Sequence, residues 1–390
     1  MSKSNETTPN VPTLRFREFI DSWTLIPIKK LLRFQNGINA DSTKYGKGIK
    51  YISVSDILNN QYITYDCIKG LIDIDEKTLN RFIVEYGDIL FQRSSETFED
   101  IGRANVYLDK EHSATFGGFV IRGKKISDYN PLFFRYLLCT HNARKQTVRM
   151  GAGAQHYNIG QEGLEKICLY FPCLQEQQKI SDFLSAIDNK IAVQNKIISK
   201  YETLIKGIRE RIVNCGWQWK KLDELIQEGV VRLNRGNIIP KHQKDNTYKY
   251  PVYSSSTQNN GLMGYNDTYM FDKELITWSI DGGGNFFYRK KHKFNVTNVC
   301  GIMQVDENVY SYRFITEMLT YQHSKMKFDY QSKAHPSVIS SLYSLPCLPI
   351  SEQNFYCQLF IVLDKKMHIE QCSLNKLKEQ KKYLLSKMFI

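Results

Sequence analysis

Apolar residues in two stretches of the chain recur at alternating steps of four and three positions. From residue 180 the pattern runs through Ile180, Leu184, Ile187, Ile191, Gln194, Ile198, Tyr201, Ile205, Ile208 and Ile212. The same phase returns 176 residues later, at Tyr356, Phe360, Leu363, Met367, Glu370, Leu374, Leu377, Lys381, Leu384 and Met388. A heptad pattern sustained over this length is typical of a coiled coil.

Each stretch predicts one helix of about 38 residues, roughly 57 Å long at the helical rise per residue. A narrow apolar stripe on so long a helix needs a matching stripe, and the other copy provides one. Antiparallel pairing is favoured, because the segment between the copies must bring the chain back before the second helix starts. Gln194 and Glu370 form the same polar break and would set the register. The alternative is two independent core helices in separate domains.

A strand-rich segment precedes each helix. Alternating apolar positions predict strands at residues 49–54, 87–91, 250–253 and 275–280, with a polar turn at 254–261. Each segment starts near a tryptophan and ends on a proline-containing strand, although the two differ in sequence. The sequence therefore predicts an α+β fold with two strand-rich domains separated by two long helices, in a pseudo-two-fold internal repeat.

The predicted boundaries follow from this alternation of segments. They are a flexible N-terminal tail 1–13, a first domain 14–172, a first helix 173–213, a second domain 214–348 and a second helix 349–390.

The chain carries a formal charge of +13 and has a pI near 9.1. This surplus favours a polyanionic partner, either nucleic acid or an anionic membrane, with an ordinary basic soluble protein as the alternative. No apolar run approaches the roughly 20 residues of a membrane-spanning helix, and residues 1–9 lack the apolar stretch of a signal peptide. We therefore expect a cytoplasmic protein.

The surplus of positive charge is spread over both domains and both helices, with basic concentrations at 289–293 and at 144–149.

The nine cysteines form no Cys-x-x-Cys pair, and no metal-ligand spacing is present. We expect reduced thiols and no metal site.

Several segments in a fixed order resemble the specificity (S) subunit of type I restriction–modification systems. They are the opening segment 11–19 followed by Trp23, the Glu176-Gln177 and Glu352-Gln353 motifs at the two helix starts, the 250–253 strand, the Asn260-Gly261 turn and residues 276–285. The resemblance covers nearly the whole chain.

The resemblance implies two target-recognition domains, each reading one half of a split asymmetric sequence in double-stranded DNA. The conserved spacer helices would hold the domains apart and dock two methyltransferase subunits, and motor-nuclease subunits would join for cleavage. Adenine methylation or restriction would then be carried out by the partners. S-adenosylmethionine, ATP and Mg are expected on those partners, with no cofactor in this chain.

Base contacts in such a subunit are expected from polar side chains on loops, with basic residues holding phosphates. In the first domain we predict DNA contacts from Arg93, Ser94, Ser95, Arg149, Gln155, His156 and Asn158. In the second domain we predict them from Ser255, Asn259, Asn260, Arg289, Lys290, Lys291, Lys333 and His335. His156 and His335 precede their helices by similar distances, which suggests equivalent roles. A polar turn residue that bonds only to backbone is the alternative for each.

Motifs of catalysis are weak in this sequence. Asn130-Pro131-Leu132-Phe133 is similar to an adenine methyltransferase motif but lacks its second proline, so a turn at a helix start is favoured. Gly282-Gly283-Gly284 is not followed by the Gly-Lys-Ser/Thr of a phosphate loop. We expect a non-catalytic chain. A stand-alone bipartite DNA-binding regulator and a single-chain enzyme are the alternatives.

Overall fold

The computed structural model describes residues 10–153, 156–239, 249–256, 258–281, 283–326 and 333–390. The chain divides into two compact units. Unit 1 comprises Met1–Asn195 and Ser373–Ile390, and unit 2 comprises Lys196–Cys372. Each unit therefore combines one strand-rich domain with part of each long helix. We call these parts domain 1 (residues 24–171) and domain 2 (residues 219–346).

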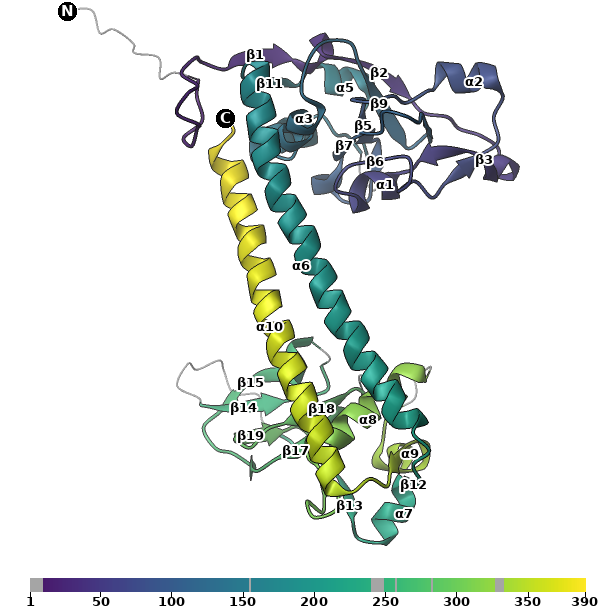
Figure 1. The fold of residues 1–390 in the computed structure, drawn as a ribbon, viewed down its shortest axis with the longest axis vertical. Helices are drawn as coiled ribbons and strands as arrows, with labels where there is room; N and C mark the ends of the chain where they lie inside the picture. Colours follow the sequence, from purple (N-terminus) through teal and green to yellow (C-terminus); the bar gives the residue numbers. More distant parts are fainter. Residues whose placement is uncertain (1–9, 154–155, 240–248, 257, 282, 327–332) are drawn as a thin grey trace, which may run out of the picture. The chain divides into compact units, whose positions relative to one another are not determined.

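The two predicted long helices are α6 (Leu174–Asn214) and α10 (Ile350–Lys387) (Figure 1). All twenty seam positions of the heptad pattern are buried or half-buried. In unit 1 the start of α6 packs against the end of α10, with Leu184 and Leu384 in one core. In unit 2 the end of α6 and the start of α10 share a core that contains Ile212 and Phe360. The helices thus pack antiparallel, as the sequence predicts.

Domain 1 is built on an antiparallel sheet in the order β2-β9-β5-β7. Its strands are β2 (Leu32–Asn36), β5 (Ile89–Gln92), β7 (Ala104–Val106) and β9 (Val120–Lys125). Apolar side chains of this sheet and of helix α3 (Pro131–Leu138) form a core with the start of α6 and the end of α10. The domain is therefore fixed to both helices through buried apolar surface.

Smaller elements complete domain 1. A second sheet, in the order β4-β3-β8, pairs β3 and β8 in parallel. The remaining strands are β1 (Thr24–Pro27), β3 (Tyr45–Ile52), β4 (Leu71–Ile72), β6 (Ser94–Ser95), β8 (Thr115–Phe116), β10 (Tyr157–Asn158) and β11 (Cys168–Phe171). The helices are α1 (Val54–Asn59), α2 (Glu76–Arg81), α3 (Pro131–Leu138), α4 (His141–Arg149) and α5 (Gln161–Glu165).

Domain 2 repeats this plan with two four-stranded sheets, β13-β20-β17-β18 and β15-β14-β19-β16. The strands of the first sheet are β13 (Val231–Arg235), β17 (Leu275–Ser279), β18 (Phe286–Arg289) and β20 (Cys300–Val305). Those of the second are β14 (Tyr250–Tyr253), β15 (Leu262–Asn266), β16 (Phe271–Asp272) and β19 (Lys293–Val296). The other elements are β12 (Trp219–Lys221), β21 (Ser344–Pro346), α7 (Leu222–Gln227), α8 (Tyr312–Lys325) and α9 (Pro336–Leu342).

Equivalent hydrogen bonds show that the two domains have the same topology. In each domain the first strand pairs with the last, β1 with β11 and β12 with β21. The parallel pair β3·β8 of domain 1 corresponds to β14·β19 of domain 2. After these pairs, Gly117 N–H donates to Ile52 O at 3.0 Å, and Thr297 N–H donates to Tyr253 O at 2.9 Å. The internal repeat therefore extends from the helices into the domains, despite their unlike sequences.

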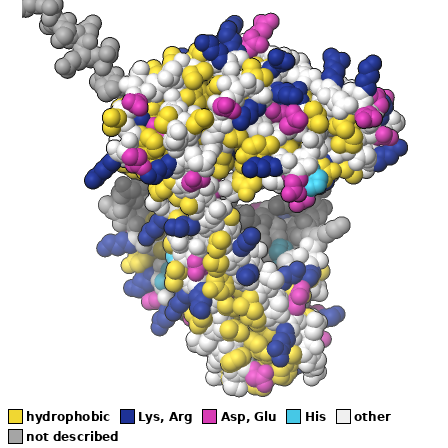
Figure 2. Space-filling model, turned by 45° about the horizontal axis from the view of Figure 1, so that its top comes forward, with side chains coloured by type: hydrophobic (Ala, Val, Ile, Leu, Met, Phe, Trp, Pro, Cys, Tyr) yellow, Lys and Arg dark blue, Asp and Glu magenta, His cyan; other side chains and the backbone are white. Residues whose placement is uncertain are grey.

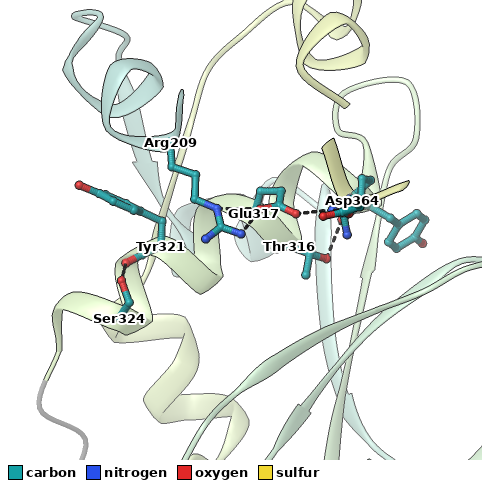
Figure 3. Close-up of polar contacts among 8 residues, drawn as sticks. Arg209, Thr316, Glu317, Tyr321, Ser324 and Asp364 are labelled. Carbon is teal, nitrogen blue, oxygen red and sulfur yellow. Dashed lines mark hydrogen bonds and ion pairs between the residues drawn. The ribbon is translucent and has the colours of Figure 1, made fainter. Parts of the chain in front are cut away.

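Polar clusters fix each domain to the helices. In unit 1, Asp188 of α6 accepts hydrogen bonds from Tyr136 Oη of α3 at 2.7 Å and from Lys381 of α10. In unit 2, Glu317 of α8 pairs with Arg209 of α6 (Figure 3). Arg313 of α8 pairs with Asp364 of α10. Burial raises the pKa of Asp364, and Arg313 opposes that rise. Each cluster thus joins the domain to α6 and α10 at once.

The prediction of a flexible N-terminal tail needs correction at its end. Residues 1–9 lie outside the described residues, but 10–13 are held by hydrogen bonds. Asn10 O accepts from Trp23 N–H at 2.9 Å, and Thr13 Oγ1 donates to Lys387 O at 3.2 Å. Just beyond, Arg15 forms a two-pronged ion pair with the fully buried Glu176 at 2.7 Å. The segment is therefore part of the packed unit, because it covers the start of α6.

Candidate nucleic-acid interface

Four of the predicted residues in domain 1 lie together where strand β5 ends. Strand β6 pairs with β10, which sets Ser94 opposite Asn158. Ser94 Oγ donates to Asn158 Oδ1, and Asn158 Nδ2 donates to His156 O at 3.3 Å. Arg93 Nη1 donates to Gly118 O at 3.3 Å. We call Arg93, Ser94, His156 and Asn158 the domain 1 loop cluster; all four are at least partly exposed.

The remaining predicted residues of domain 1 differ in their surroundings. Ser95 is 8% exposed, and its Oγ accepts from Thr97 N–H at 3.2 Å. Ser95 is thus a buried residue of strand β6 whose hydroxyl bonds to the backbone that follows the strand, and its contact with DNA stays a prediction. Arg149 is exposed at the end of α4, before Ala152, which pairs with Asn158. Gln155 lies outside the described residues.

In domain 2, Lys333 occupies the position that corresponds to Asn158 of the domain 1 loop cluster. In domain 1, Arg93 N–H donates to Phe119 O at 2.9 Å, and Ile159 N–H donates to Arg93 O at 3.0 Å. In domain 2, Ile280 N–H donates to Val299 O at 3.1 Å, and Ala334 N–H donates to Ile280 O at 2.9 Å. Ser94 and Asn158 thus correspond to Asp281 and Lys333, which form an ion pair at 3.5 Å. A polar pair stands at the same point of both domains.

This register overturns the suggested equivalence of the two histidines. His335 directly follows Ala334 and lies at the N-cap of α9, without a side-chain capping bond. His156 instead precedes Ile159, the equivalent of Ala334, by three positions. The two histidines therefore occupy different backbone positions, and similar distance from the long helices is a coincidence of loop length.

The polar turn of domain 2 carries three further predicted residues. Asn259 and Asn260 have φ values of 48° and 51°, in the left-handed region that asparagine tolerates better than most residues. Both side chains are exposed. Ser279 Oγ donates to Ser255 O at 2.6 Å, which fixes the turn beside the end of β17. The turn and the Asp281–Lys333 pair therefore lie at the same edge of the sheet.

Arg289 is buried rather than free to bind a phosphate. Its side chain is 4% exposed, and its guanidinium lies 3.6 Å from the centre of the Tyr253 ring. Nε donates to Thr277 Oγ1 at 2.9 Å, and Nη2 donates to Asn260 O at 2.8 Å. Burial lowers the pKa of Arg289 to about 10. The prediction of a direct DNA contact is corrected: Arg289 holds the turn, while its neighbours Lys290 and Lys291 are exposed.

Two exposed apolar side chains were missed at the sequence level. Phe119 is 70% exposed in the turn between β8 and β9, and its carbonyl accepts the Arg93 N–H. Ile238 is 81% exposed after β13, next to Asn237, which pairs with Thr297. A large apolar residue directly after Gly117-Gly118, between two apolar strands, was the available signal. Apolar side chains in such loops can contact a thymine methyl or wedge between bases.

One face of the molecule has mixed charge. On the face shown in Figure 2, Lys and Arg side chains are scattered among acidic and apolar ones rather than gathered in one patch. The described residues contain no group of His, Cys, Asp and Glu that could hold a metal ion. Among the same residues, no helix has both the length and the hydropathy needed to cross a membrane.

The sequence matches a protein family model twice, over residues 22–203 and 214–383, and that family is the type I restriction modification DNA specificity domain. A predicted type I specificity subunit of Mycoplasma pneumoniae is 36% identical over 132 residues, which cover 32% of this chain and 42% of the relative. A second from the same organism is 25% identical over 194 residues, which cover 49% of this chain and 81% of that relative. The alignment thus spans under half the length of the first relative.

Solved structures resemble the chain over nearly all of its length. The S subunit of a type I restriction–modification system from M. genitalium matches with a TM-score of 0.64 and 16% identity, covering 97% of this chain and 99% of that one. A chain from a structural study of type I complex assembly and conformational transition matches with a TM-score of 0.54 and 12% identity, covering 94% and 97%. At such low identity the likeness shows a shared fold.

Proposed function

The chain belongs to the family of type I restriction modification DNA specificity domains, and from this membership we propose that it recognises a split, asymmetric sequence in double-stranded DNA. Domain 1 reads one half of the target and domain 2 reads the other. The observation that carries the proposal is the shared backbone register of the two domains, which sets Ser94–Asn158 and Asp281–Lys333 at one position with different chemistry. The same scaffold with unlike side chains suits two unlike half-sites.

The chemistry of these loops fits direct readout. Asparagine and arginine side chains bond to base edges in the major groove, and four such side chains are at least partly exposed, those of Arg93, Asn158, Asn259 and Asn260. Lys290 and Lys291 are exposed beside the domain 2 turn, where they can neutralise phosphates. In domain 2, base contacts from Asn259 and Asn260 and phosphate contacts from Lys290 and Lys291 would then come from segments that Arg289 joins.

In the proposed function, the chain directs partner subunits to the DNA target and catalyses no reaction itself. Two methyltransferase subunits dock on the paired helices, and motor-nuclease subunits join them for restriction. S-adenosylmethionine, ATP and Mg belong to those partners. The repeated heptad pattern of α6 and α10 supports this arrangement, because two related helices suit two copies of one partner.

Single-molecule methylome sequencing tests the proposal. A host expressing this chain with its cognate methyltransferase subunit should acquire a split motif that contains methylated adenine in both halves. A continuous motif, or no methylation from a complex that forms, would contradict recognition by two domains. In the second case the chain would act as a DNA-binding regulator.

A further inference from the structure

A cavity of about 220 Å³ opens between α1, β7, α3 and α4 of domain 1. Three arginines line it, Arg103 of the β7 edge, Arg135 of α3 and Arg144 of α4. None of the lining residues is acidic. One water molecule needs only about 10–15 Å³ in this measure, so the cavity has room for a polyatomic anion.

Two of the arginines are held in place by the loop before β7. Arg144 Nη2 donates to Glu99 O at 2.8 Å and to Ile101 O at 2.7 Å. Arg103 Nε donates to Asp100 Oδ1 at 2.6 Å. Asp100 also accepts from Thr97 Oγ1 at 2.8 Å, and this hydroxyl holds the pKa of Asp100 below its usual value. The carboxylate of Asp100 thus pairs with Arg103, at the edge of the cavity.

The third arginine has an unused donor. Arg135 Nε is buried and has no hydrogen-bond partner among the described residues. The pKa of Arg144 is lowered by burial and further by the charge of Arg103. A buried N–H without an acceptor disfavours an empty site, and so do three guanidinium charges that face the single carboxylate of Asp100. Both features indicate an anionic ligand that accepts hydrogen bonds.

We propose that this cavity binds a phosphate group. The flat guanidinium fork matches the oxygens of a phosphate, and guanidinium groups are the usual choice for such recognition. The cavity also adjoins the domain 1 loop cluster. Gln92 N–H donates to Arg103 O at 2.7 Å, and Arg93 of the cluster directly follows Gln92. A DNA phosphodiester beside the bases read by the loop cluster is one source of the group, and that case rests on the proposed function. A free phosphate ion is the other source, and that case does not rest on the proposed function.

Arg135→Gln tests the site, because glutamine removes the charge and keeps a polar side chain. Arg33→Gln is the matched control, since Arg33 is exposed on β2 and does not line the cavity. The full chain of each variant is titrated with two probes. The first is a duplex that carries the target, at several salt concentrations. The second is inorganic phosphate against chloride at equal ionic strength, followed by the thermal unfolding midpoint.

For a phosphodiester, Arg135→Gln should weaken DNA binding about tenfold for target and non-target duplexes alike. The slope of log K against log salt should fall by about 0.9, the value of one phosphate contact. For a free phosphate, the ion should raise the unfolding midpoint of the native chain and of Arg33→Gln but not of Arg135→Gln, with DNA affinity unchanged.

The inference is overturned if Arg135→Gln matches Arg33→Gln with both probes. A native chain that binds no DNA selectively would refute the proposed function instead, and the phosphate titration would still report on the cavity.

Discussion

Gln177 and Gln353 stand 176 residues apart and share two equivalent hydrogen bonds. Gln177 Nε2 donates to Pro172 O at 2.9 Å, and its Oε1 accepts from Asn130 N–H at 2.9 Å. Gln353 Nε2 donates to Leu348 O at 2.9 Å, and its Oε1 accepts from Ser311 N–H at 3.0 Å. Each glutamine therefore ties the first turn of a long helix to the start of a helix in its own domain. This accounts for glutamine in both Glu-Gln motifs.

Replacing Gln177 by Ala should destabilise unit 1. The substitution leaves the Asn130 N–H and the Pro172 carbonyl without their partner, and each buried group left unsatisfied costs about 1–3 kcal/mol. We expect a loss of about 2–4 kcal/mol in the free energy of unfolding, measured by chemical denaturation.

Gln175→Ala is the control for this prediction, because Gln175 is exposed on the same helical turn. A Gln177→Ala chain as stable as Gln175→Ala would show that the paired hydrogen bonds contribute little.

The long helices were predictable because a heptad phase survives divergence at individual positions. The same sequence reasoning failed at Arg289, since a basic run of five residues does not reveal which side chain turns inward. Arg289 ends strand β18 opposite Leu275, and its side chain is buried while Lys290 leaves the sheet. The predicted equivalence of His156 and His335 was wrong for a related reason. Which residues of the two domains are equivalent depends on hydrogen bonds to strands far away in the sequence, and loop length does not predict those bonds.

Replacing Ile187 by Asp should disrupt the packing of α6 in unit 1. Ile187 is buried in the core shared by domain 1, α6 and the end of α10. A carboxylate placed there has no described partner and costs more than about 4 kcal/mol. We expect the thermal midpoint to fall sharply, and the double variant with Ile191→Asp to fall further.

Val193→Asp separates this effect from helix propensity. Val193 is exposed on the same helix, so its replacement should cost less than about 1 kcal/mol. Equal effects of the buried and exposed substitutions would mean that the seam does not hold the helices.

Replacing Arg289 by Lys or Met should weaken recognition through the domain 2 turn. Neither side chain can bond to Thr277 and Asn260 at once and also cover the Tyr253 ring as a planar guanidinium does. We expect a stability loss of about 1–3 kcal/mol together with weaker binding of the target duplex. Lys290→Met provides the contrast, because Lys290 is exposed and should change DNA affinity without changing the unfolding midpoint.

His323 should make unit 2 less stable in acid. Burial lowers the pKa of His323 below its ordinary 6.5, so the folded chain binds this proton less readily than the unfolded chain. The resulting stability is present above pH 6.5 and is lost as the pH falls through the lowered pKa. His323→Gln should flatten the fall of the unfolding free energy below pH 6.5, since glutamine does not titrate. His141→Gln, at an exposed histidine of α4, should leave the fall unchanged.

Substitutions in the domain 1 loop cluster and in the Asp281–Lys333 pair of domain 2 should alter opposite halves of the target. Arg93→Ala removes a partly exposed guanidinium from the domain 1 loop cluster, and Lys333→Ala removes an exposed cation from the position of domain 2 that corresponds to Asn158. One lost base contact costs about 1–3 kcal/mol of discrimination, or roughly fivefold to 150-fold. Methylome sequencing should therefore show relaxed preference in one half-site for Arg93→Ala and in the other for Lys333→Ala. If either substitution relaxed both halves, or if both relaxed the same half, the assignment of one domain to one half-site would be wrong.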